Sequence, residues 1–332
     1  MRARRVRRRH TAPDPAGPQA RGLVASRPLD QLAVRTEGLV PRMPDPSAER
    51  DAVEAESAFS HPAVAPDATA AYGEHPDQVI DFFAPRDGRD RAPLVVVLHG
   101  GAWRAPYDRQ HISPFADFLA RRGFAVASVE YRRGGELPRP RGTEPVAGRW
   151  PETFDDVAAA MDLLPGLARE ALPGADTRRI VVTGHSAGGH LALWAAARHV
   201  LTPDSAWHLP AAPALRGVVA LAPIADFTAA EELGVCGGAT AQLLGGKEHF
   251  DERRPYADPA ALLPTGIATV LVQGRTDIVV PRAVAESYTD AAAKAGEPVW
   301  LTLLEDVGHF PLIDPASDAC AVVAEEIEQL AY

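Results

Sequence analysis

The segment from residue 181 to residue 194 constrains the fold of this chain more than any other. Its sequence, VVTGHSAGGHLALW, starts with apolar residues, passes through Gly-His-Ser-Ala-Gly and continues into a second apolar run. This pattern predicts a strand, a sharp turn and a helix, with Ser186 in a strained backbone conformation at the turn. The small residues at 184, 187 and 188 allow strand and helix to approach closely. We therefore expect the Ser186 hydroxyl to project above the carboxyl end of a sheet strand.

Apolar runs alternate with amphipathic stretches from Tyr72 to the end of the chain. Strands are expected at 78–84, 94–98, 124–131, 180–183, 218–221, 269–272 and 300–304, and helices at 112–122, 153–172, 282–295 and 316–330. Pro165 is expected to kink or split the helix at 153–172. The alternation predicts one α/β domain with a mostly parallel central sheet flanked by helices. The intervening stretches 134–149 and 227–263 follow strand ends, so we expect them to form active-site walls or a small lid.

The N-terminal part has a different composition. Residues 1–70 are rich in Pro, Ala, Arg and Asp without sustained periodicity, so we expect a largely disordered, basic and Pro-rich extension before a single catalytic domain at 71–332. Residues 1–42 hold ten Arg and three acidic residues, whereas the whole chain has a net charge of −10. No apolar stretch follows the arginines, which argues against a secretory signal. Met43 begins a more acidic stretch, which raises the hypothesis that translation starts there.

Charge and motif content exclude several classes of protein. The net charge of −10 gives no reason to expect a nucleic-acid partner, and no apolar run approaches the ~18 residues that would span a membrane. Cys236 and Cys320 have neither disulfide nor metal-ligand spacing, so we expect free thiols and a cytoplasmic protein. Phosphate-binding glycine motifs are absent, and the histidines near the glycine-rich segments lack metal-ligand spacing. We expect neither a cofactor nor a metal.

A nucleophilic serine needs a base and a carboxylate that orients the base. Asp277 lies in Gly-Arg-Thr-Asp, directly after the expected strand at 269–272. His309 lies in Gly-His-Phe, after the expected strand at 300–304. Because parallel strands end at the same edge of a sheet, these side chains can meet Ser186 there. We predict that Ser186 is the nucleophile, His309 the base and Asp277 the orienting carboxylate.

Other residues compete for these roles. Asp226, after the strand at 218–221, is the main alternative for the carboxylate. Weaker alternatives lie close to His309 in the sequence: Glu305, Asp306 and Asp314. His185 and His190 flank the serine, but a residue adjacent to the nucleophile on the turn points away from its hydroxyl. We expect both histidines to be packing residues.

Acyl transfer also needs hydrogen-bond donors for the developing oxyanion. The loop 99–103, His-Gly-Gly-Ala-Trp, follows the strand at 94–98, and its glycines let backbone N–H groups approach a substrate. We predict an oxyanion hole formed by the N–H groups of Gly100, Gly101 and Ala187. Among the nearby aromatic residues, Trp103 and Phe310 are predicted to wall an acyl or aryl pocket. Weaker candidates for the wall are Tyr107 and Trp150.

Together with Glu130-Tyr131-Arg132-Arg133 at a strand end, these motifs resemble the α/β-hydrolase superfamily. The likeness spans roughly residues 72–330 and is greatest to its esterase/lipase branch, with hormone-sensitive-lipase-like esterases, kynurenine formamidase-like enzymes and prolyl-oligopeptidase-type catalytic domains. The resemblance implies the α/β-hydrolase fold, the same triad order and the same oxyanion donors. Two departures concern Ala102: lipase-like members often have a third glycine there, and formamidase-like members an aromatic residue.

The expected function is a serine hydrolase that cleaves a small carboxylic ester through an acyl-enzyme intermediate. Its expected partner is therefore a small-molecule ester or amide. Two alternatives share the carbonyl chemistry: an aryl-formamidase and a peptidase of the prolyl-oligopeptidase type, although no propeller-like segment precedes the catalytic domain. A third alternative is a non-catalytic binding protein on the same scaffold, but such proteins typically lose the serine or the histidine.

Overall fold

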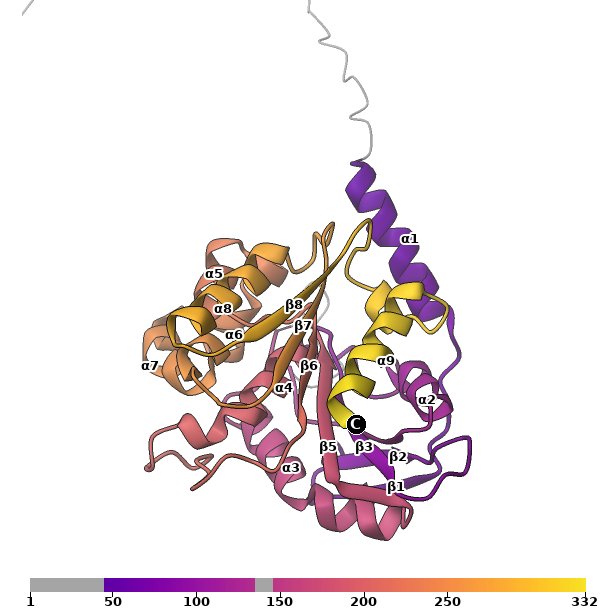
Figure 1. Cartoon of the computed structure of the whole chain (residues 1–332). Coiled ribbons are helices and arrows are strands. Elements are labelled where there is room, and N and C mark those ends of the chain that lie inside the picture. The colour runs from indigo at the N-terminus through magenta and orange to yellow at the C-terminus, as the bar shows by residue number, and fades with distance from the viewer. Residues whose placement is uncertain (1–44, 135–145) are drawn as a thin grey trace, which may run out of the picture. The chain divides into compact units, whose positions relative to one another are not determined.

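The computed structural model describes residues 45–134 and 146–332 and contains an eight-stranded sheet (Figure 1). The strand order is β1-β2-β4-β3-β5-β6-β7-β8. The strands are β1 Ala68–Ala71, β2 Val79–Phe83, β3 Ala92–Leu98, β4 Ala125–Val129, β5 Ala175–His185, β6 Gly217–Leu221, β7 Thr269–Gly274 and β8 Val299–Leu304. Strand β2 pairs antiparallel with both β1 and β4, and all other neighbours pair parallel. The sheet is therefore mostly parallel, as predicted.

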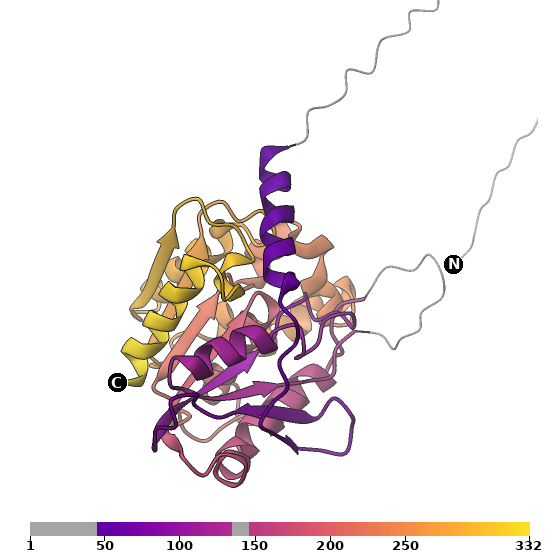
Figure 2. The ribbon, with the colours of Figure 1, turned by 90° about the vertical axis from the view of Figure 1, so that its right-hand side faces the viewer.

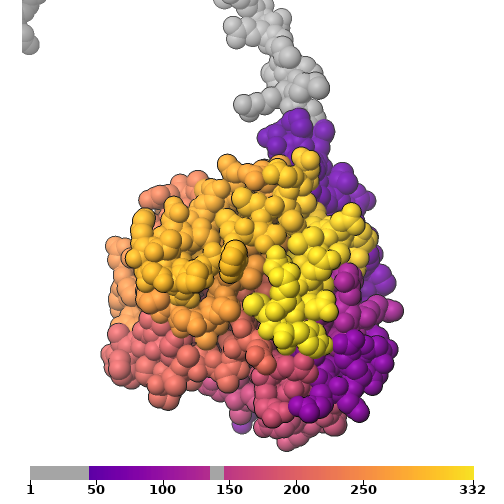
Figure 3. All heavy atoms as spheres, viewed as in Figure 1, coloured from indigo at the N-terminus to yellow at the C-terminus, as the bar shows by residue number. Residues whose placement is uncertain are grey.

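Helices cover both faces of this sheet. One face carries α2 (Ser113–Arg121) and α9 (Asp318–Ala331), and the other carries α3 (Glu152–Ala171), α4 (Ala187–Ala197) and α8 (Arg282–Lys294) (Figures 1 and 2). In the space-filling view, the yellow α9 lies between the orange C-terminal strand region and the purple N-terminal strands (Figure 3). This layered arrangement of helices on both faces of a mostly parallel sheet is that of an α/β protein, as predicted.

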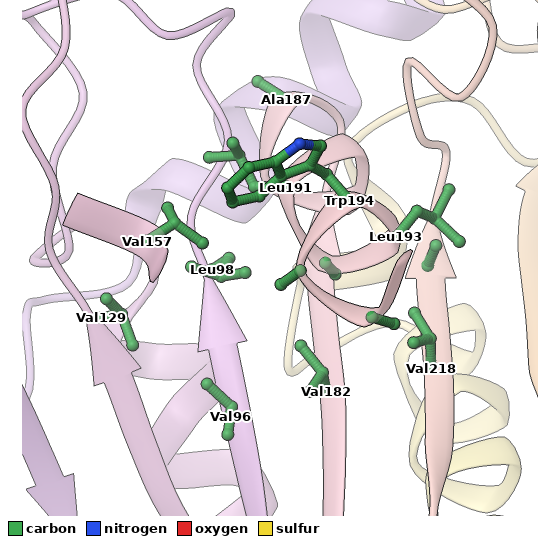
Figure 4. Close-up of a cluster of buried hydrophobic side chains, with 14 of the residues drawn as sticks. Val96, Leu98, Val129, Val157, Val182, Ala187, Leu191, Leu193, Trp194 and Val218 are labelled. Carbon is green, nitrogen blue, oxygen red and sulfur yellow. The ribbon is translucent and has the colours of Figure 1, made fainter. Parts of the chain in front are cut away.

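The densest part of the core lies under α4. Leu191 and Trp194 of this helix are fully buried against β3 and β5, where Leu98 and Val182 face them (Figure 4). A Cβ at Gly188 would lie 2.0 Å from the Leu98 carbonyl oxygen. Only glycine permits this approach, because the opposing atom is backbone and cannot move aside. The close contact between the turn and its neighbouring strand that the sequence predicted is therefore confirmed.

Every expected strand and helix is present, with end points that differ by a few residues. The expected break at Pro165 was wrong, because α3 continues through it as one helix. Proline removes one N–H donor and frees the carbonyl four residues earlier. Pro165 and Met161 are both only half-buried, so water can hydrogen-bond the freed carbonyl.

Residues 1–70 were expected to be largely disordered, and this prediction was wrong for residues 45–70, which the structure describes. Helix α1 (Pro46–Ser60) and strand β1 lie in this range, and residues 1–44 lie outside the described residues. Asp45 caps α1, and the Ser57 hydroxyl donates a 2.5 Å hydrogen bond to Asp314, 257 residues away. The helix lies beside the turn Pro311–Ile313 (Figures 1 and 2). Tertiary contacts therefore order a segment whose own periodicity is weak.

The two intervening stretches have different outcomes. Residues 135–145 of the expected wall at 134–149 lie outside the described residues. The stretch 227–263 contains the short helices α5 (Phe227–Glu232), α6 (Ala239–Leu243) and α7 (Phe250–Ala257), and its Cys236 lines the cavity described below. Among the helices that the structure describes, none has the length and apolarity needed to cross a membrane.

Candidate active site

Ser186 occupies a strained turn between β5 and α4. Its backbone has φ 56° and ψ −116°, a conformation that costs a non-glycine residue about 1–3 kcal/mol. Backbone hydrogen bonds hold the turn: the Ser186 N–H donates to the Leu221 carbonyl at 2.8 Å, and its carbonyl accepts from the His190 N–H at 3.1 Å. The surrounding structure thus imposes a geometry that places the side chain at the carboxyl end of the sheet.

His309 and Asp277 meet across the ends of β7 and β8. The His309 Nδ1 and Asp277 Oδ2 atoms lie 2.7 Å apart, and both side chains are buried. Asp277 Oδ1 accepts from the N–H groups of Val279 and Val280 at 2.8 and 2.9 Å, so the carboxylate is fixed in orientation. Because the carboxylate accepts a hydrogen bond from the Nδ1–H of a neutral imidazole, the ring lone pair is on Nε2. His309 is therefore oriented to accept a proton there.

The alternative carboxylates are engaged elsewhere. Asp226 caps α5 by accepting from the Ala229 N–H, and its other oxygen accepts from the Ser287 hydroxyl at 2.6 Å. Three acidic residues close to His309 in sequence also have other environments: Glu305 pairs with Arg275, Asp306 is exposed in a turn, and Asp314 accepts from Ser57 and His61. In the described part of the chain, only Asp277 bonds the His309 ring.

The two histidines beside the serine have separate surroundings. His190 Nε2 donates to the Ala257 carbonyl at 2.9 Å in the core under α7. His185 Nε2 donates to the carbonyl of His309 at 2.9 Å, and the two rings lie 4.3 Å apart. Burial, together with the neighbouring His309, lowers the pKa of His185 well below its usual value. His185 is thus a neutral support for the His309 loop, a role that sequence reasoning missed because no local pattern connects the two residues.

The three predicted oxyanion donors are backbone N–H groups close to Ser186 in the structure. Those of Gly100, Gly101 and Ala187 donate no hydrogen bond to any other described residue. A Cβ at Gly100 would lie 3.4 Å from the Ser186 Cβ, which places this loop against the serine. Unpaired amide donors in a protein interior are rare. Free N–H donors beside a nucleophile are what an oxyanion hole needs, so Gly100, Gly101 and Ala187 remain the predicted donors.

A buried polar network holds the glycine loop in place. His99 bonds the Gly100 carbonyl through Nδ1 at 2.9 Å and Glu130 through Nε2 at 2.8 Å. Tyr131 stacks on the His99 ring at 4.3 Å and donates its hydroxyl proton to the His99 carbonyl. Glu130 also pairs with Arg133 at 2.8 Å. The Glu-Tyr-Arg-Arg strand end therefore anchors the loop that carries the free N–H groups.

Ser186 and His309 line one cavity of about 160 Å³. Its remaining walls come from the glycine loop, the insertion and α1: Phe59, Gly101, Ala102, Arg104, Tyr107, His111, His185, Cys236, Val279, Phe310 and Ile313. In this structure the Ser186 hydroxyl makes no hydrogen bond to the His309 ring, and such contacts often shorten only when substrate binds.

The four aromatic residues predicted as possible pocket walls have different outcomes. Phe310 lines the cavity, and so does Tyr107. Trp103 does not: it is fully buried, and its ring packs edge-on against His190 and Phe227. Trp103 also has a positive φ of 54°, which the sequence pattern did not indicate. Trp150 packs against Phe154 and Trp207 instead of the cavity.

Helix α1 supplies contacts that sequence reasoning did not anticipate. The Arg50 guanidinium donates to the Thr276 carbonyl at 3.0 Å, and Glu54 accepts from the Gly308 N–H at 3.2 Å. Thr276 and Gly308 are the residues directly before Asp277 and His309 in the sequence. Phe59 adds an aromatic wall, with its ring centroid 5.3 Å from that of Phe310. The helix therefore braces both loops, and only the tertiary structure brings it there.

Comparison with known proteins defines the class. Among solved structures, the fold is similar to an esterase B from Lactobacillus rhamnosis (TM-score 0.64, 17% identity, covering 86% of this chain and 91% of that one). It is also similar to a truncated carbohydrate esterase from gut microbiota (TM-score 0.64, 18% identity, 80% and 96% covered). At these identities the likeness establishes the fold, which is that of the α/β-hydrolases. The family model BD-FAE matches residues 80–291, so the chain belongs to the BD-FAE family.

Curated relatives carry esterase names. A probable isoprenylcysteine alpha-carbonyl methylesterase of Oryza sativa subsp. japonica is 26% identical over 249 residues, covering 72% of this chain and 56% of the relative. A probable carboxylic ester hydrolase, LipM, of Mycobacterium tuberculosis is 27% identical over 251 residues, covering 71% and 53%. The chain thus spans little more than half the length of these relatives. The predicted α/β-hydrolase fold is confirmed, and the names of these relatives support the ester hydrolysis proposed below.

Proposed function

We propose that this chain hydrolyses small carboxylic esters through an acyl-enzyme intermediate, with Ser186 as nucleophile. The observation that carries the proposal is the shared cavity of Ser186 and His309, with His309 held at Nδ1 by Asp277, 2.7 Å away. A serine hydroxyl is a weak nucleophile at neutral pH and becomes effective when a correctly oriented imidazole accepts its proton. The family membership and the names of the relatives support the same chemistry.

In the acylation step, the Ser186 oxygen attacks the ester carbonyl while His309 Nε2 accepts the hydroxyl proton. The carbonyl oxygen becomes an oxyanion, and the free N–H groups of Gly100, Gly101 and Ala187 stabilise it. His309 then donates its proton to the leaving alcohol, and Ser186 retains the acyl group. In deacylation, a water molecule transfers a proton to His309 as it attacks, and collapse of the second oxyanion releases the acid and restores the serine proton.

The cavity favours a small substrate. A space of about 160 Å³ is comparable with an apolar cavity of roughly 150 Å³ that holds one benzene molecule. Drug-sized ligands occupy pockets of about 300–1,000 Å³. We infer that the acyl group enclosed here has few carbon atoms, and that turnover falls sharply along a series of straight-chain esters from acetate to octanoate.

A fluorophosphonate probe followed by mass spectrometry tests the nucleophile. We expect one covalent adduct, located on Ser186, and loss of both the adduct and esterase activity in Ser186→Ala. Ser205→Ala is the matched control, because this serine lies in a loop away from the cavity and its loss should change neither result. An adduct that persists in Ser186→Ala refutes this choice of nucleophile. An unlabelled, inactive wild-type protein favours a non-catalytic binding role on the same scaffold.

The competing carbonyl substrates are tested with the same preparation. The panel contains straight-chain nitrophenyl esters, N-formylkynurenine and an aminopeptidase substrate. We expect the short esters to have the highest kcat/KM. A higher value for N-formylkynurenine would replace ester hydrolysis by aryl-formamide hydrolysis, and a higher value for the peptide substrate would assign a peptidase.

A further inference from the structure

Arg104 places a cation in the wall of the proposed acyl cavity. It follows the glycine loop directly, where its N–H donates to the Gly101 carbonyl at 3.0 Å, and its side chain lines the same cavity as Ser186 and His309. The mechanism proposed above gives this residue no task. Part of its guanidinium is buried, because the Nε atom has no contact with solvent, and a buried charged group needs a compensating interaction.

No acidic group of the cavity balances this charge. The lining contains no Asp or Glu, and no described carboxylate lies within 4.0 Å of the Arg104 guanidinium. Arg109 and Arg133, in the neighbouring network, both pair with Glu130. Burial, with help from the neighbouring His99, lowers the pKa of the lining residue His111 to about 4, so that ring is neutral at pH 7. Arg104 is therefore the permanent charge of the described cavity wall.

The guanidinium has unused hydrogen-bond donors. One terminal nitrogen donates to the Cys236 carbonyl at 2.6 Å. The Nε–H is buried and has no partner among the described residues. An arginine carries five N–H donors in a planar fork that matches the geometry of a carboxylate. The side chain is thus anchored on one side, with donors left for an anion.

We propose that Arg104 selects esters that carry a carboxylate, which its guanidinium binds while Ser186 attacks the ester carbonyl. This inference rests on the proposed esterase function and adds the substrate class to it. The chain as a whole has a net charge of −10, so long-range attraction does not draw anions to this site. Recognition depends on the local pair, which is strong because hydrogen bonds between two ionised groups are stronger than those between neutral groups.

Matched ester pairs test the proposal and locate the carboxylate. Monoethyl succinate is compared with ethyl butyrate, which places the charge on the acyl half. The second pair, 4-acetoxybenzoate and 4-methylphenyl acetate, places it on the alcohol half. Product release is measured chromatographically for wild type, Arg104→Met and Arg104→Lys. We expect Arg104→Met to lower kcat/KM about 10- to 100-fold for the charged ester of one pair, the range for one charge-assisted hydrogen bond, and to spare its neutral partner. Arg104→Lys should recover part of the loss.

Arg178→Met is the control for the change in overall charge. Arg178 lies on β5 at the end of the strand opposite Ser186, with 78% of its side chain exposed, so its removal should leave all four rates unchanged. Equal losses on charged and neutral esters in Arg104→Met would reduce Arg104 to an anchor for the Cys236 loop and overturn the proposal. The proposal would also be overturned if the wild-type protein cleaved the charged and the neutral ester of each pair with equal kcat/KM.

Fluorophosphonate labelling separates this failure from failure of the proposed function. If Ser186 is labelled and neutral esters are cleaved without any preference for a carboxylate, only the role of Arg104 is refuted. If Ser186 is not labelled and no ester is cleaved, the esterase function and the selectivity that rests on it are both refuted.

Discussion

Replacing Asp277 by Asn should remove catalysis by changing the His309 tautomer. The Oδ1 atom of Asp277 accepts from the N–H groups of Val279 and Val280 at 2.8 and 2.9 Å. An asparagine is expected to keep its carbonyl oxygen there, because a flipped amide would leave both N–H groups without an acceptor, at about 1–3 kcal/mol each, whereas this orientation loses only the 3.1 Å hydrogen bond from Gln273 to Oδ2. Its NH₂ group then faces His309 Nδ1, 2.7 Å from the atom it replaces.

The consequence for His309 follows from hydrogen-bond polarity. An NH₂ donor at this position requires an unprotonated Nδ1, so the ring proton moves to Nε2. A protonated Nε2 cannot accept the Ser186 proton. Asp-to-Asn exchange in another serine hydrolase lowers kcat about 10⁴-fold, and we expect about 10²–10⁴-fold here, or roughly 3–5 kcal/mol of activation free energy.

The assay is turnover of a short nitrophenyl ester beside the rate of fluorophosphonate labelling, and both should fall together. Circular dichroism should report a native fold, because Asn preserves the shape of the side chain. Asp226→Asn is the matched control: it makes the same chemical change at a helix cap that does not contact His309, and Asn caps helices as well as Asp. Turnover within threefold of wild type in Asp277→Asn, or an equal loss in Asp226→Asn, would refute the assignment.

Four further predictions concern the support of the site. Gly274→Ala should lower kcat about 10- to 100-fold, since its Cβ would lie 2.3 Å from the Gly308 carbonyl oxygen and separate the two catalytic loops; unchanged kcat would contradict this. Glu54→Ala should lower kcat about tenfold with little change in KM, and equal kcat values would show that α1 does not brace the loop. Burial lowers the pKa of His190 to about 3, so between this pH and 6.5 only the unfolded chain binds a proton at this residue, and the free energy of unfolding falls as the pH falls. In urea titrations, His190→Phe should remove about 2 kcal/mol of the decrease in unfolding free energy between pH 6.5 and 5. The same decrease in wild type and variant would refute this prediction. Dialysis against EDTA should leave turnover unchanged, and a loss restored by added metal would contradict the proposed mechanism.

The sequence predicted the features that depend on neighbouring residues. The strained turn at Ser186 follows from a strand, small residues and a helix in succession, and the structure has this conformation. The parallel sheet follows from the alternation of apolar runs, and a shared edge of that sheet brings Asp277 to His309. Family resemblance supported the same fold. These inferences succeeded because secondary structure and strand direction are encoded within short windows of sequence.

Other features have no local signal. Trp103 was expected in the pocket wall, but its ring is buried in the core against His190 and Phe227. The segment that forms helix α1 was expected to be disordered, because its own sequence has only weak periodicity. In the structure it hydrogen-bonds to Thr276 and Gly308, which lie more than 200 residues away in the chain.

The sequence by itself therefore determined the fold class and the chemical types available at the sheet edge. Only the tertiary structure decided which groups share one cavity and which charges remain unpaired there. The case of Arg104 illustrates the difference. In the sequence it is one of many arginines, whereas in the structure the absence of a carboxylate among the described residues around it sets it apart. Pairing of charges depends on distances in space, and these arise only when separate segments pack together.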